Sequence, residues 1–306
     1  MPLIYSIIAP LLIISSVAVY QGEAFTAIET ARLLQNCMLI AGIGTLLQLY
    51  PIWKIGSGLP VVMGISFTFL AACLATASQD YGIMVGAIIV GGCFEGVLGL
   101  TAKYWRKIIS PIVSACVVVS IGLSILNVGV SSFGSSSAYP LGSWQNLLVA
   151  TITLAAALSG GVFGCSPITS FSQNVGLISM THVVNRFTIM VGALAMILGG
   201  LFPPIGAFFT TLPDCVLGGC TVIMFGSIMM SGVRMMHDAG MDQRNTLIAA
   251  TSICLGVGVT QVDGFFNELP SFIGDIFAGN MVAGVFVVGL ILDLCLPRDP
   301  SHYTSM

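Results

Sequence analysis

The chain has 306 residues, of which 56% are hydrophobic and only 7% are charged, and its formal net charge is -3. A soluble globular domain averages about 25% charged residues. The composition therefore excludes a soluble domain and predicts an integral membrane protein. The net charge says little about partners, because a membrane protein carries its charge information in its loops, and no nucleic-acid partner is expected.

Long apolar runs follow one another along the whole chain, and most are near the roughly 20 residues that a membrane-spanning helix needs. Together with a short polar helix expected after Pro167, they make about eleven segments. A chain spans lipid only as helices or as a closed barrel, and barrel strands would alternate in polarity every second residue. We therefore expect one all-α polytopic domain over residues 1–306. The runs cover 3–20, 33–50, 59–77, 82–100, 108–130, 144–163, 187–209, 215–233, 246–260 and 278–296.

Acidic and basic loops alternate between these runs. Cytoplasmic loops carry an excess of Lys and Arg, so the basic loops predict the orientation of the chain. In the first half, the loops predicted to be cytoplasmic are those with Lys54 and with Lys103, Arg106 and Lys107.

Two of the segments are interrupted in similar ways. One opens with Pro60 and reaches Ser66-Phe67, and the other opens with Pro167 and reaches Gln173-Asn174. An unsatisfied amide at membrane depth costs roughly 2–7 kcal/mol, so these groups must pair with protein, water or a ligand. Paired interruptions in two halves of a chain are typical of transporters that bind substrate at the membrane midplane. The alternative is two kinked helices whose Ser and Gln side chains are satisfied internally.

The stretch Gln173-Asn174-Val175-Gly176, followed by Thr181, resembles the signature of the nucleobase-ascorbate transporter family, also called nucleobase:cation symporter-2. The stretches 56–67, 217–219 and 225–234 also resemble their counterparts in that family. The resemblance implies an inverted-repeat transporter fold whose two broken segments meet at the midplane. It also implies a multi-pass protein of the bacterial cytoplasmic membrane that moves uracil, xanthine or related purines with H⁺ or Na⁺. No enzyme activity and no cofactor are expected, and a homodimer is a candidate assembly.

The resemblance also assigns roles to individual residues. An amide at Gln173 suits a base, because its carbonyl and NH₂ can face both acceptor and donor edges of a purine or pyrimidine. Gly176 would allow a helix or a ligand to approach closely. The implied substrate-binding residues are Gln173, Ser172, Phe67 and Ser66, and the implied supporting residues are Asn174, Gly176 and Thr181.

The chain departs from the family by lacking segments. Residues 144–166 resemble the start of segment six joined directly to the end of segment nine, so segments seven and eight and parts of one, six and nine are missing. We therefore divide the domain into a first-repeat part (1–143), a fused segment (144–166) and a second-repeat part (167–306). The segment-eight carboxylate that the family uses for substrate and ion is lost with them. The alternative function is accordingly a non-transporting remnant or a regulatory partner of a full-length permease.

Three further expectations concern the membrane interior. Glu95 is expected to be hydrogen-bonded at a close helix contact formed by Gly92 and Gly96. Asp293 is expected to reach the membrane interface. Gly160, Gly161, Gly164 and Pro167 would let the fused segment 144–166 end early, so it is expected not to complete a crossing. The C-terminal half is then expected to keep the family's orientation, with His302 in the cytoplasm.

Overall fold

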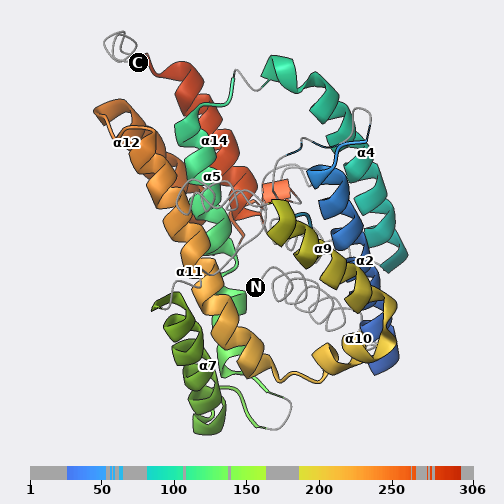
Figure 1. The fold of residues 1–306 in the computed structure, drawn as a ribbon. Coiled ribbons are helices and arrows are strands. Elements are labelled where there is room, and N and C mark those ends of the chain that lie inside the picture. Colours follow the sequence, from blue (N-terminus) through green and yellow to red (C-terminus); the bar gives the residue numbers. More distant parts are fainter. Residues whose placement is uncertain are drawn as a thin grey trace. The chain divides into compact units, whose positions relative to one another are not determined.

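The computed structural model describes residues 26–52, 56, 58, 62–64, 81–105, 108–136, 139–162, 186–262, 264–266, 274, 276–277 and 280–297. Within these residues every regular element is a helix (Figure 1). The helices are α2 (Ala27–Leu49), α4 (Tyr81–Trp105), α5 (Pro111–Ser124), α6 (Leu126–Gly134), α7 (Trp144–Val162), α9 (Arg186–Leu201), α10 (Pro203–Thr210), α11 (Asp214–Asp238), α12 (Gln243–Gln261) and α14 (Met281–Cys295).

Polar caps set where several helices begin. Thr26 and Glu29 form a capping box, in which the Thr26 hydroxyl accepts the Glu29 N–H at 3.3 Å and the Glu29 carboxylate accepts the Thr26 N–H at 2.9 Å. Asp242 caps α12 by accepting the Asn245 N–H at 2.8 Å. Each cap satisfies N–H groups that the first helical turn leaves free. Helices α2 and α12 therefore start before the apolar runs that predicted them.

Two predicted runs are each divided into two helices. The run 187–209 contains α9 and α10, which are separated at Phe202. Pro203 follows directly, and proline has no N–H with which to continue the preceding helix. The run 108–130 contains α5 and the start of α6, with the break at Ile125.

The chain forms two compact units, and each unit takes helices from both halves of the sequence. Unit 1 comprises residues 1–84 and 125–227, and unit 2 comprises 85–124 and 228–306. In unit 1, α2 packs against α9 and α10, and α6 packs against α7. In unit 2, α5, α12 and α14 pack against one another (Figure 1).

The core of unit 2 lies between α5, α12 and α14. Val113 and Cys116 of α5, Ile248 of α12 and Val285 of α14 are all fully buried in it. A Cβ atom on Gly256 would lie 2.7 Å from the Val285 backbone nitrogen, so α12 and α14 approach closely only because that position is glycine.

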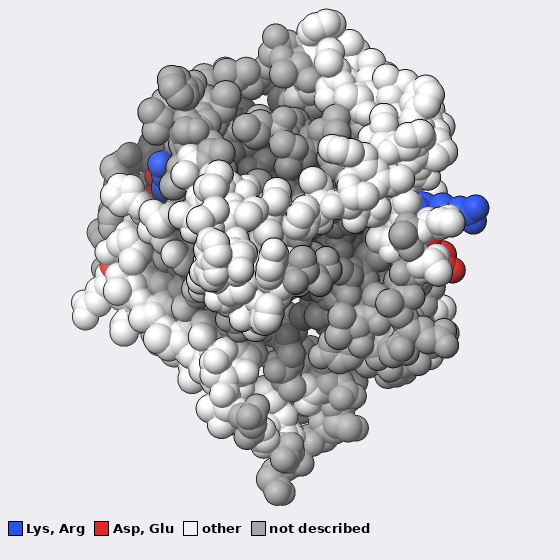
Figure 2. Space-filling view, turned by 90° about the horizontal axis from the view of Figure 1, so that it is seen from below, with Lys and Arg blue, Asp and Glu red and all other residues white. Residues whose placement is uncertain are grey.

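Four helical stretches are long and apolar enough to cross a membrane, as judged over the described residues: Ile28–Leu49, Gly82–Thr101, Pro111–Gly134 and Cys215–Asp238. Figure 2 shows few charged side chains among the described residues on the face that it presents. The chain is therefore an all-α polytopic membrane protein, as its composition predicts.

The environment of Glu95 differs from the prediction. Glu95 is exposed on α4, and within 4 Å of a Cβ placed on Gly92 or Gly96 there is no atom of the described residues. The predicted close helix contact at these glycines is therefore not found in the part of the chain that is described. Most other side chains of α4 are also exposed and apolar, a surface that lipid solvates.

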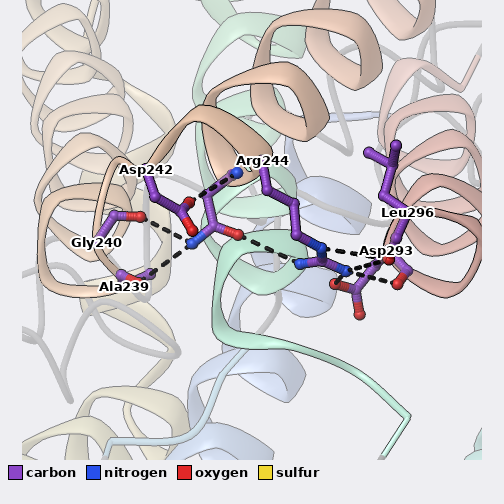
Figure 3. Close-up of polar contacts among 7 residues, drawn as sticks. Ala239, Gly240, Asp242, Arg244, Asp293 and Leu296 are labelled. Carbon is purple, nitrogen blue, oxygen red and sulfur yellow. Dashed lines mark hydrogen bonds and ion pairs between the residues drawn. The ribbon is translucent and has the colours of Figure 1, made fainter. Parts of the chain in front are cut away.

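The prediction for Asp293 is wrong. Asp293 is only 1% exposed, and its carboxylate lies 2.8 Å from the Arg244 guanidinium of α12. Arg244 also donates to the backbone carbonyls of Asp293 at 2.7 Å and of Leu296 at 3.4 Å (Figure 3). A charged partner lets the carboxylate stay buried at the end of α14, so it does not need to reach the interface.

The fused segment forms helix α7 over most of its length, and residues 163–166 lie outside the described residues, so the expected incomplete crossing stays a prediction. Helix α7 continues through Gly160 and Gly161 to Val162. Glycine weakens a helix by roughly 0.5–1 kcal/mol relative to alanine, which is too little to end a 19-residue apolar helix.

Candidate functional site

The residues predicted to bind or support substrate lie outside the described residues. These are Ser66, Phe67, Ser172, Gln173, Asn174, Gly176 and Thr181. Their predicted roles therefore stay predictions. The described residues closest to them in sequence are Val62, Met63 and Gly64, which precede Ser66, and Val162 and Arg186, which flank the second interruption.

Residues 62–64 are not helical, which agrees with the predicted interruption of the first broken segment. Their backbone is bound by Thr45, a fully buried residue near the C-terminal end of α2. The Met63 N–H donates to the Thr45 hydroxyl oxygen at 2.9 Å, and this hydroxyl donates in turn to the Ala41 carbonyl at 2.7 Å. The N–H that the interruption frees from a helix is thus satisfied by protein, as membrane depth requires.

The chain turns back at the end of α2 to reach this position. Gly56 and Gly58 have φ angles of +97° and +70°, a left-handed region that glycine adopts without steric cost. The Gly58 N–H donates to the Gln48 carbonyl at 2.9 Å, which ties the turn to the last turn of the helix. Two left-handed residues therefore bring the interrupted segment alongside the helix that precedes it.

The support beneath residues 62–64 is the pair of helices α2 and α9. Val62 is 2% exposed and packs with Ala41 of α2 and Met196 of α9. The two helices approach closely at Gly42, where a Cβ atom would lie 2.9 Å from the Ala193 carbonyl oxygen. Close packing over small residues is the usual way in which membrane helices associate firmly. Non-helical backbone is thus fixed on a rigid pair of helices.

No group of three His, Cys, Asp or Glu side chains that could hold a metal ion occurs among the described residues. The Thr45–Met63 contact was missed by sequence reasoning. The interruption at Pro60 and Gly64 indicates free backbone groups, but no local pattern identifies the side chain that satisfies them.

Non-helical backbone within an apolar segment, fixed on a pair of helices, is one feature of secondary transporters. Comparison with known proteins agrees. The model of the Permease family (Xan_ur_permease) matches residues 5–160 and 155–265. The chain therefore belongs to this permease family.

Individual relatives share about a quarter of their residues with the chain. The xanthine permease XanQ of Escherichia coli (strain K12) is 26% identical over 95% of this chain and 88% of its own length. The xanthine permease XanP of the same strain is 24% identical, over 96% of this chain and 89% of its own length. The xanthine permease of Bacillus subtilis (strain 168) is 27% identical, over 90% and 88% respectively.

These alignments contain many positions at which this chain has no residue. The alignment with XanQ has 414 positions, whereas 95% of the 306 residues is about 291, so about 123 positions have no residue in this chain. The same comparison with the Bacillus subtilis permease gives 388 positions against about 275 residues, a difference of about 113. The two family-model matches meet at 155–160, within α7 and within the segment predicted to be fused.

Proposed function

We propose that this chain is a nucleobase transporter for a xanthine- or uracil-type base, working by symport with H⁺ or Na⁺. The observation that carries the proposal is the family match over 5–160 and 155–265, together with relatives named as xanthine permeases. The membrane would be the bacterial cytoplasmic membrane, because these relatives come from bacteria.

In this proposal the base lies between the two interrupted segments. Gln173 hydrogen-bonds one polar edge of the base, with Ser172 beside it, and Phe67 and Ser66 line the opposite side. Asn174, Gly176 and Thr181 hold the second segment in place. What supports this arrangement is that residues 62–64, which directly precede Ser66 in the sequence, are not helical, as expected of an interrupted segment.

A second candidate function is favoured by the alignment positions at which this chain has no residue. More than a hundred positions of the relatives have no counterpart in this chain, enough for several spans of about 20 residues each. A chain that lacks them could instead be a non-transporting partner that packs against a full-length permease, or a remnant.

Uptake of labelled xanthine and uracil into cells that lack their own permeases tests the proposal. We expect saturable uptake that exceeds the vector control and falls when the proton gradient is collapsed or when Na⁺ is replaced, depending on the coupling ion. Uptake equal to the control would favour the non-transporting alternative. A matched experiment measures base uptake by a full-length relative, alone and together with this chain. A change in the relative's uptake rate would reveal a regulatory effect.

A further inference from the structure

The hydroxyl of Thr45 joins two parts of unit 1. It accepts the Met63 N–H at 2.9 Å and donates to the Ala41 carbonyl at 2.7 Å, while the Met63 carbonyl oxygen lies 3.4 Å away. A threonine in a helix commonly donates to the carbonyl four residues earlier. Here that donation fixes the direction of the hydroxyl, so that a lone pair faces the Met63 N–H.

Thr221, another buried threonine, forms its hydrogen bond within its own helix. Thr221 of α11 is also fully buried, but its hydroxyl donates to the Gly218 carbonyl of its own helix at 2.9 Å. The Thr45 hydroxyl instead accepts an N–H from backbone 18 residues away that has left helical geometry. Thr221 therefore offers a matched control, because it is the same residue type with the same burial and a bond within its own helix.

The residues around the Thr45–Met63 contact restrict the position of residues 62–64. Val62, on one side of Met63, is buried between α2 and α9. A Cβ on Gly44 would lie 3.4 Å from the Met63 Cβ, so Met63 lies directly against the backbone of α2. Ser66 follows Met63 by three residues, which can span at most about 10 Å. Met63 therefore limits how far Ser66 can lie from the Thr45 contact.

We propose that Thr45 is a positioning residue for the nucleobase site, a role that rests on the proposed function. It holds the Met63 backbone of the first broken segment against α2, and in this way limits where Ser66 and Phe67 can lie against a planar base. Thr45 touches no substrate in this proposal. Its hydroxyl acts through the Met63 backbone.

The test compares the parent protein with Thr45→Val, Thr45→Ser and Thr221→Val, each purified in detergent. Binding of labelled xanthine and uracil is measured by equilibrium binding, and amide exchange of the peptide around Met63 is followed by mass spectrometry. Val keeps the shape of Thr and removes the hydroxyl, whereas Ser keeps the hydroxyl. Thr45→Ala gives the same loss of hydroxyl in a smaller side chain if Val is not tolerated.

We expect Thr45→Val to weaken base binding about tenfold and to speed exchange at Met63, because one buried hydrogen bond is lost. Thr45→Ser should restore most of the affinity, and Thr221→Val should leave both readouts unchanged. Equal binding by the parent and Thr45→Val, or an equal loss in Thr221→Val, would overturn the positioning role. No binding by the parent would overturn the proposed function and the role with it. In that case faster exchange in Thr45→Val would still show that the Met63 contact exists.

Discussion

Arg244 and Asp293 form a buried ion pair between the first turn of α12 and the last turn of α14, with 2.8 Å between the guanidinium and the carboxylate. The Asp293 side chain is fully buried, whereas that of Arg244 is 16% exposed. The guanidinium also binds carbonyls at the end of α14, where the helix cannot satisfy them itself. The pair and these carbonyl contacts together fix the α12–α14 contact at one end of unit 2.

Removing one partner of this pair should destabilise the protein strongly. Arg244→Met leaves the Asp293 carboxylate buried without its cation, at an expected cost of about 3 kcal/mol, the lower end of the range because Arg244 is partly exposed. The double variant Arg244→Met with Asp293→Leu should be more stable than Arg244→Met alone. Thermal unfolding in detergent measures both. Strictly additive effects of the two substitutions would show that the residues are not coupled.

The close approach of α12 and α14 gives a second prediction. Gly256→Ala should lower the unfolding temperature, with a cost of about 1–3 kcal/mol, because the new Cβ would lie 2.7 Å from the Val285 nitrogen and the helices must separate. Gly258 lies on the same helix with open space around a Cβ. Gly258→Ala should therefore raise stability by about 0.5–1 kcal/mol. If both alanine variants behave alike, the contact at Gly256 is looser than described.

The connection between α6 and α7 depends on a buried amide. Asn146 is 2% exposed, and its NH₂ group donates to the carbonyls of Gly134 at 2.9 Å and Pro140 at 3.2 Å. Asn146→Asp replaces this donor by an acceptor that faces the same carbonyls. We expect a loss of about 2–3 kcal/mol in thermal unfolding. Ser136→Ala removes the 2.7 Å bond from the Ser136 hydroxyl to the Asn146 side-chain oxygen and the exposed 3.2 Å bond from the Tyr139 N–H to that hydroxyl, and should cost about 1 kcal/mol. A smaller loss in Asn146→Asp than in Ser136→Ala would contradict this ranking.

Much of the helical architecture is predictable from hydropathy, because an apolar run is a local property. The residues at which the helices begin and end are less predictable. Thr26 and Asp242 extend α2 and α12 by polar first turns that a hydropathy window excludes. Pro203 explains a division that the continuous run 187–209 concealed.

Contacts between residues that lie far apart in the sequence could not be predicted from it. The partner of Asp293 lies 49 residues earlier on another helix, so the carboxylate was assigned to the membrane interface by its position alone. Thr45 shows the same limit within the candidate site. Its position in an apolar helix gives no sign that its hydroxyl satisfies backbone 18 residues later.

The orientation of the C-terminal half is a further prediction. Helix α7 has 19 residues, about 28 Å at 1.5 Å per residue, which is close to the thickness of the hydrocarbon core. A full crossing by α7 would invert everything after it relative to the family. The basic residues Arg186, Arg234, Arg244 and Arg298 favour the family orientation, with His302 in the cytoplasm.

A single cysteine at Ser301, placed in a cysteine-free background, tests this orientation. We expect a membrane-impermeant thiol reagent to label it only after the cells are opened. Efficient labelling in intact cells would show that α7 crosses fully and that the charges do not set the orientation.

The central claim is that this chain retains a nucleobase site built around Gln173. Equilibrium binding of labelled xanthine and uracil to the purified protein tests it most directly, with Gln173→Ala as the matched variant. We predict saturable binding of at least one base by the parent, and binding weaker by roughly tenfold to a hundredfold in Gln173→Ala, because one or two hydrogen bonds in a dry site are lost. The unfolding temperature without ligand should not change. Absence of saturable binding, or equal binding by the two proteins, would contradict the claim.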